Sequence, residues 1–87
     1  MTKRKIVINN SVGLHARPAA LFAELAQKYT ANISVTCNQK TVNAKSLLGL
    51  LGLGASKGSS IEIVAEGLDE LEAINALISL IENNFGE

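Results

Sequence analysis

Aromatic side chains are nearly absent from this sequence, and their absence limits what kind of core it can build. The 87 residues include two Phe, one Tyr and no Trp. Hydrophobic residues still make up 47% of the chain, so its core must consist mainly of Leu, Ile, Val and Ala. The length fits one compact domain, which we expect to span residues 1–87.

The chain also has no excess of charge, because eight Lys and Arg balance eight Asp and Glu. A neutral protein lacks the field that holds nucleic acid or a membrane surface, so we expect neither partner. We interpret the basic cluster Lys3–Lys5 as a solvated chain end rather than a binding patch. No apolar run has the length of a signal peptide or a membrane span, which predicts a cytoplasmic protein without membrane insertion.

Cysteine is limited to Cys37, which cannot form an internal disulfide and is too few for a typical metal site. Its place in an alternating segment indicates a buried strand residue rather than a reactive thiol. The glycines at 52, 54 and 58 match neither a phosphate-binding P-loop nor a dinucleotide fingerprint. We therefore expect no metal and no cofactor.

Four short segments have the apolar content and mostly the alternation of strands. They are residues 5–8, 33–37, 40–43 and 61–66, with a turn at Asn38-Gln39 between the second and third. Apolar residues occupy one face of these segments and polar residues the other. This pattern predicts an antiparallel sheet with one buried face and one solvated face.

Three segments follow the helical period instead: residues 16–28, 46–53 and 70–84. The last follows Asp69, a favoured N-cap residue, with Glu72 at the spacing of a capping box. Its apolar stripe is expected to consist of Leu71, Ile74, Leu77, Ile78 and Ile81. The resulting order, strand-helix-strand-strand-helix-strand-helix, predicts an α+β fold with the helices on one side of the sheet.

The only histidine of the chain, His15, lies where the first strand gives way to the first helix. Pro18 suits the first turn of that helix, where a missing N–H is tolerated. The amides of Ala16 and Arg17 have no partners inside the helix and point outward with the positive end of its dipole. Such a helix start is a ready anion site, and phosphate is a common occupant.

Side chains at this helix start add chemistry to simple anion binding. The guanidinium of Arg17 can hold two phosphate oxygens, and the neutral imidazole of His15 can attack phosphorus. A phosphoimidazole would then be stabilised by about 1–3 kcal/mol, loosely enough for the group to leave again. The alternative is that His15 is only a helix cap or a surface loop residue; its context favours the nucleophile.

The segment Gly13–Ala19 (GLHARPA) resembles the active-site motif of the HPr family, the histidine-containing phosphocarriers of the bacterial sugar phosphotransferase system. The resemblance covers the whole chain, including Lys45-Ser46 and the segment Ala55–Gly58. It implies that enzyme I phosphorylates Nδ1 of His15, with phosphoenolpyruvate as the source. It further implies onward transfer to IIA domains of sugar permeases, with Arg17 stabilising the phosphate.

The resemblance also implies a fold and a mode of action. The family fold is a two-layer open-faced sandwich with a four-stranded antiparallel sheet, order 1-4-2-3, and three helices on one face. Such a protein is a stoichiometric carrier rather than an enzyme, and we expect a monomer.

Ser46 precedes the second helical segment, and its simplest role is that of an N-cap. The resemblance implies a second role. In many Gram-positive members, HPr kinase/phosphorylase phosphorylates the serine here, and the product is a corepressor of a catabolite control protein. Our hypothesis is that a phosphate on Ser46 weakens docking of enzyme I by like-charge repulsion.

The leucines after Ser46 are more numerous than one face of a short helix can bury. We expect Leu50 to point inward. Three others should face outward near His15 as a partner surface: Leu47, Leu48 and Leu51. An apolar patch ringed by Arg17 and Lys45 would suit a transient protein interface.

Two positions depart from enteric members of the family, which have lysines facing enzyme I where this chain has Glu24 and Gln27. Fewer positive charges weaken electrostatic steering towards partners. Two alternatives to the sugar branch stay open. One is the nitrogen-related HPr paralogue, which shares the His15 motif; the other is a regulatory binding module controlled by phosphorylation.

Overall fold

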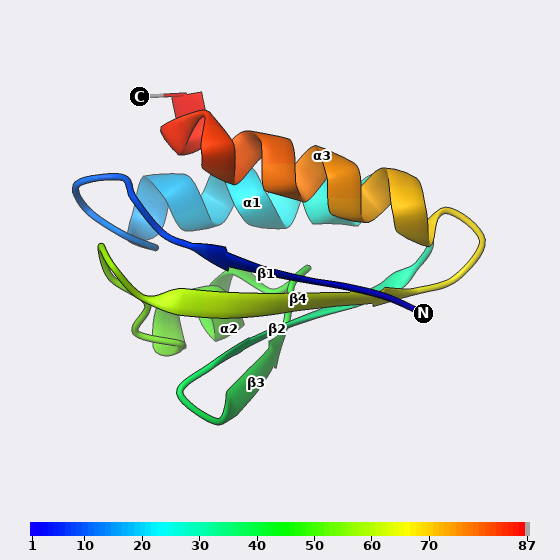
Figure 1. The fold of residues 1–87 in the computed structure, drawn as a ribbon, viewed down its shortest axis with the longest axis horizontal. Helices are drawn as coiled ribbons and strands as arrows, with labels where there is room; N and C mark the ends of the chain where they lie inside the picture. The colour runs from blue at the N-terminus through cyan, green and yellow to red at the C-terminus, as the bar shows by residue number, and fades with distance from the viewer. Residues whose placement is uncertain (87) are drawn as a thin grey trace.

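The strands and helices occur in the predicted order in the computed structural model, which describes residues 1–86 (Figure 1). They are β1 (Thr2–Val7), α1 (Ala16–Gln27), β2 (Asn32–Cys37), β3 (Lys40–Asn43), α2 (Leu47–Gly52), β4 (Ser60–Glu66) and α3 (Glu70–Glu82), followed by a short 3-10 turn at Asn84–Gly86. No helix within residues 1–86 is long and apolar enough to cross a bilayer.

The four strands form one antiparallel sheet in the order β1-β4-β2-β3, as the resemblance implies. β4 therefore lies between β1 and β2, which are far from it in sequence. Val35 of β2 faces Ile63 of β4, and Ile6 of β1 faces Ile61 of the same strand. This register brings the apolar positions of neighbouring strands onto one face of the sheet.

That face is the floor of the core. Ile33, Val35 and Cys37 of β2 are buried, as are the alternate residues of β4, which confirms the predicted inward set. The helices cover this face, with α1 and α3 lying next to each other above it (Figure 1). Phe22 of α1 and Leu77 of α3 are fully buried and belong to the core between the helices and the sheet. The opposite face of the sheet is open.

The first strand differs from the prediction because it begins three residues earlier. Residues Lys3–Lys5 lie within β1 and pair with Glu62–Val64, so they are exposed residues of an edge strand rather than part of a loose chain end. Charged residues on an edge strand discourage pairing with another chain. Ile8 follows β1 and is buried, with its amide donating to the carbonyl of Ser59 at 2.8 Å.

The turn between β2 and β3 forms where it was predicted. Asn38 and Gln39 have φ angles of 51° and 69°, the left-handed pair that a two-residue hairpin requires. Asparagine tolerates this region better than most residues, which explains the position of the turn.

The start of α3 confirms the predicted N-cap position but not the predicted capping by side chains. Asp69 occupies the N-cap position, but its carboxylate does not cap the helix; it accepts the amides of Thr30 and Ala31 at 2.8 and 2.9 Å instead. These two hydrogen bonds, the one from Thr30 foremost, hold the pKa of Asp69 below its usual value. Glu72 is exposed and completes no capping box among residues 1–86.

The apolar stripe of α3 was also predicted too wide. Ile74, Leu77, Ile78 and Ile81 are buried, but Leu71 is 60% exposed. Glu70, one turn before Ile74, is half-buried. It accepts hydrogen bonds from the Thr2 hydroxyl at 2.6 Å and the Gly67 amide at 3.1 Å.

Candidate functional site

His15 occupies the N-cap position of α1. Its backbone is extended (φ −79°, ψ −176°), and its carbonyl accepts the amide of Ala19 at 2.8 Å. The imidazole makes no capping hydrogen bond, and the residue is exposed. His15 is therefore the N-cap residue of α1 through its backbone alone, and its ring takes no part in capping.

The helix start beside His15 has unused positive character. Within residues 1–86, the amides of Ala16 and Arg17 donate to no acceptor. The first turn of α1 contains no acidic residue, so nothing there neutralises the helix dipole. Arg17 is exposed and forms no ion pair in the described part of the chain. The three predicted residues thus lie together, with the amides and one guanidinium available to an anion.

The loop that carries His15 is held from within by two hydrogen bonds between Asn10 and Gly13. The amide of Gly13 donates to the carbonyl of Asn10 at 3.3 Å, and Nδ2 of Asn10 donates to the carbonyl of Gly13 at 2.9 Å. Sequence reasoning missed Asn10. The relevant signal was an asparagine three residues before a glycine, because Asn favours the first position of a turn.

The same loop is held from outside by the segment that follows α2. Leu14 donates its amide to the carbonyl of Ala55 at 3.0 Å. Gly13 has φ +65°, and a Cβ there would lie 2.6 Å from Cα of Ser56. Only glycine permits this approach. The Ala55–Gly58 segment, which is part of the resemblance to the family, therefore lies against the His15 loop.

Ser46 is the N-cap of α2, as predicted: its Oγ accepts the amide of Gly49 at 3.0 Å. It lies at the other end of α1 from His15. Gln27, the last residue of α1, donates from its side chain to the carbonyl of Lys45 at 2.9 Å. Twelve helical residues span about 18 Å, so roughly one helix length separates Ser46 from His15.

Lys45 corrects the prediction of a patch ringed by cations. Its ammonium donates to the carbonyl of Tyr29 at 2.6 Å, just beyond the C-terminal end of α1. A cation there is favourable because the last carbonyls of a helix carry partial negative charge. Lys45 therefore stabilises the far end of α1 and does not stand beside Arg17.

The leucines of α2 divide as predicted. Leu50 is fully buried, whereas Leu48 is 81% exposed and Leu47 and Leu51 are each about 40% exposed. α2 packs beside α1, and its C-terminal end leads to Ala55, which contacts the His15 loop. The three outward leucines thus form a small apolar surface on the helical side of the protein.

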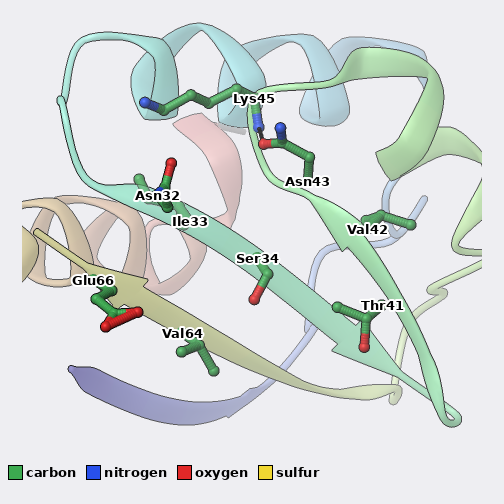
Figure 2. A pocket seen from close by; sticks show the side chains of 9 residues that line it. All are labelled: Asn32, Ile33, Ser34, Thr41, Val42, Asn43, Lys45, Val64 and Glu66. Atoms are coloured by element: carbon green, nitrogen blue, oxygen red, sulfur yellow. Dashed lines mark hydrogen bonds between the residues drawn. The ribbon is translucent and has the colours of Figure 1, made fainter.

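A depression of about 420 Å³ lies on the open face of the sheet (Figure 2). Ser34, Thr41, Val64 and Glu66 are among its lining residues, from β2, β3 and β4. His15, Arg17 and Ser46 are not among its lining residues, so the candidate site lies elsewhere on the surface. Within residues 1–86, no cluster of three or more His, Cys, Asp or Glu could hold a metal ion.

Comparison with known proteins gives matches over almost the whole chain. The model of the PTS-HPr family, described as "PTS HPr component phosphorylation site", matches residues 2–83. The chain is 45% identical to phosphocarrier protein HPr of Neisseria meningitidis serogroup A, over 100% of this chain and 98% of that protein. It is 44% identical to the HPr-like protein Crh of Halalkalibacterium halodurans, over 94% of this chain and 98% of that protein.

Solved structures agree with these sequence matches. A crystal structure of HPr from Thermoanaerobacter tengcongensis has a TM-score of 0.98 at 52% identity, covering 100% of this chain and 98% of the other. A crystal structure of a dimer of that HPr has a TM-score of 0.81, covering 100% of both chains. From its sequence, its fold and these relatives, the chain belongs to the HPr family of phosphocarrier proteins.

Proposed function

We propose that His15 accepts a phosphoryl group from phosphorylated enzyme I and donates it to IIA domains of sugar permeases, in the cytoplasm. One observation carries the proposal: the exposed imidazole of His15 forms no capping hydrogen bond and lies at a helix start with two free amides. The guanidinium of Arg17 is adjacent, and the first turn of the helix contains no carboxylate that would compete for these groups. These groups suit the transient binding of a dianion.

To load His15, the lone pair of one of its imidazole nitrogens, Nδ1 by the family resemblance, attacks the phosphorus of the donor. The bond between phosphorus and the donor breaks, and the donor leaves with that electron pair. In the onward transfer a nucleophile of the acceptor attacks the phosphorus, the P–N bond breaks, and the imidazole of His15 leaves with that electron pair. Catalysis of phosphoryl transfer depends mostly on positioning and charge stabilisation, which Arg17 and the amides of Ala16 and Arg17 supply.

The partners would dock on the exposed leucines of α2, which packs beside α1. Leu47, Leu48 and Leu51 form an apolar surface that is small enough for a weak, short-lived complex. Glu24 and Gln27 make the far half of α1 less positive than in enteric members. The exposed side chain of Gln27 also donates a hydrogen bond to the carbonyl of Lys45, so it helps to hold the segment that leads into α2.

The carrier role is tested by loading and chase. The chain is incubated with phosphoenolpyruvate and enzyme I, isolated, and mixed with a IIA domain. We expect one phosphoryl group per chain, full transfer to the IIA domain, and no label on His15→Ala. Label that stays on the chain when a competent IIA domain is added would contradict the carrier role.

We further propose that Ser46 is a regulatory phosphorylation site, a substrate for an HPr kinase/phosphorylase, whose product binds a catabolite control protein. Its position one helix length from His15 means that a phosphate there acts on partner docking rather than on the reacting nitrogen. Ser46→Asp should raise KM for enzyme I, while Ser46→Asn, a neutral residue that also favours N-caps, should not. Equal KM values for the two variants would count against this role.

A regulatory binding module without carrier activity is the alternative that the Crh relatives favour. His15 argues against it, since a module that only binds has no need of a nucleophile. The nitrogen-branch paralogue is separated by asking which enzyme I labels the chain. We propose that the carrier acts as a monomer; a dimer in sedimentation velocity, like the dimeric relative, would contradict this.

A further inference from the structure

Asn10 is the only buried polar side chain among residues 1–86, at 2% exposure. Its neighbours Asn9 and Ser11 are both exposed. An amide is costly to bury unless its polar atoms are hydrogen-bonded. The position of Asn10 therefore needs a reason in the loop around it.

The amide of Asn10 fixes the turn that leads to His15. Its Nδ2 donates to the carbonyl of Gly13 at 2.9 Å, and its own carbonyl accepts the amide of Gly13 at 3.3 Å. The next residue, Leu14, is held by Ala55. These hydrogen bonds fix the backbone at residues 13 and 14. His15 follows directly, and its ring forms no capping hydrogen bond.

The oxygen of the Asn10 side-chain amide, unlike its nitrogen, makes no stabilising hydrogen bond. Oδ1 of Asn10 is buried and accepts no hydrogen bond from residues 1–86. A buried acceptor without a donor costs about 1–3 kcal/mol, so the amide is a poor choice for stability alone. Groups that are unfavourable for folding tend to occur where geometry serves function.

We propose that Asn10 is a positioning residue for phosphoryl transfer: through the Gly13 carbonyl it sets where His15 enters α1. The ring nitrogen, the two free amides and Arg17 can converge on one phosphoryl group only if the chain enters the helix at that point. The proposal deepens the proposed function and rests on it. Small displacements of a reacting group lower transfer rates steeply.

The test compares Asn10→Ala and Asn10→Asp with Asn9→Ala as the matched control. Asn10→Asp keeps the shape of the side chain but replaces the donor with an oxygen that faces the Gly13 carbonyl. We expect both Asn10 variants to reduce the labelling rate at saturating enzyme I about tenfold, with KM for enzyme I within about twofold of wild type. Asn9→Ala should match wild type in both.

A second readout does not depend on enzyme I. Each protein is phosphorylated chemically with phosphoramidate, and the hydrolysis half-life of its phosphohistidine is measured. Asn10 variants should have a half-life changed at least threefold, because the stabilising groups no longer meet the phosphate. A fold that is merely less stable, but folded by circular dichroism at the assay temperature, would leave this half-life unchanged.

The outcomes are distinct. A wild-type chain that enzyme I never labels contradicts the proposed function, and the phosphoramidate readout still decides the role of Asn10. Asn10→Ser replaces Asn10→Ala if that variant does not fold. Wild-type labelling rates and wild-type half-lives in folded Asn10 variants would overturn the proposal.

Discussion

The amide of Leu14 donates to the carbonyl of Ala55 at 3.0 Å, and this bond joins the chain just before His15 to the segment that follows α2. Two parts of the sequence that are 41 positions apart therefore meet at the candidate site. The C-terminal end of α2 is thus linked through Ala55 to the loop that carries His15.

Gly13→Ala tests this connection. Its Cβ would lie 2.6 Å from Cα of Ser56 and 2.7 Å from the carbonyl oxygen of Ala55, so the loop must shift. Gly54→Ala is a matched control, because Gly54 has a similar φ of +73° but open space where the Cβ would be. We expect Gly13→Ala to lower the labelling rate of His15 at least tenfold more than Gly54→Ala does. Equal effects of the two substitutions would show that backbone strain alone, and not the contact with Ser56, matters.

Arg17→Ala should slow phosphoryl transfer about tenfold, because the guanidinium contributes charge-assisted hydrogen bonds to the developing dianion. Arg17→Lys should recover part of the rate, since it keeps the charge but loses the planar fork. The measurement is the single-turnover rate from enzyme I to the chain. Lys28→Ala, an exposed cation just beyond the far end of α1, is the control and should leave the rate unchanged. A normal rate for Arg17→Ala would remove the guanidinium of Arg17 from the mechanism.

Ser46→Ala should lower the free energy of unfolding by about 1 kcal/mol, because Oγ of Ser46 satisfies the amide of Gly49 at the start of α2. Ser79→Ala, on the exposed side of α3, should change it by less than about 0.5 kcal/mol. Urea denaturation of the unmodified proteins measures both. If Ser46→Ala were as stable as Ser79→Ala, the cap would contribute nothing.

Glu70 makes stability depend on acid pH. Hydrogen bonds from the α-ammonium of Met1, then from Thr2 and the amide of Gly67, lower its pKa from 4.5 to about 2. The unfolded chain therefore binds more protons between these values, so the contribution of Glu70 is complete above pH 4.5 and is lost as pH falls to about 2. The Tm difference between wild type and Glu70→Gln should be largest above pH 5 and shrink towards pH 2.

The control for this effect is Glu72→Gln, which removes an exposed carboxylate two residues away. Its Tm difference from wild type should stay constant over the same range. Both proteins must keep Met1 with a free α-amino group, because that ammonium is the main cause of the lowered pKa. A parallel pH dependence for wild type and Glu70→Gln would contradict the assignment.

Periodicity predicted the elements of the fold because each has one face in a single aliphatic core. The alternation of Ile33, Val35 and Cys37 and the helical spacing of Ile74, Leu77 and Ile78 both match buried faces. The strand order is not encoded in such local patterns and came from the family resemblance. Where the chain needed the tight hairpin at Asn38-Gln39, residue type alone located the turn.

The errors occurred where a side chain has a partner distant in sequence. Asp69 looked like a helix cap, but the amides of Thr30 and Ala31 lie 39 and 38 positions earlier in the chain. Lys45 was predicted to be a free cation, but its ammonium donates a hydrogen bond to the carbonyl of Tyr29, just beyond the end of α1. The spacing of residues within one segment does not reveal contacts with residues that are distant in the sequence. The helix start at His15 was predictable because its free amides and its exposed side chains belong to consecutive residues.

The most direct test of the account is the stoichiometry and site of labelling by phosphoenolpyruvate and enzyme I. The account predicts one phosphoryl group per chain, located on His15 by mass spectrometry of fragments, stable in base and lost in acid. His15→Ala, folded to the same degree, should take up none. A folded wild-type chain that no enzyme I labels, or a label that persists in His15→Ala, would contradict the central claim.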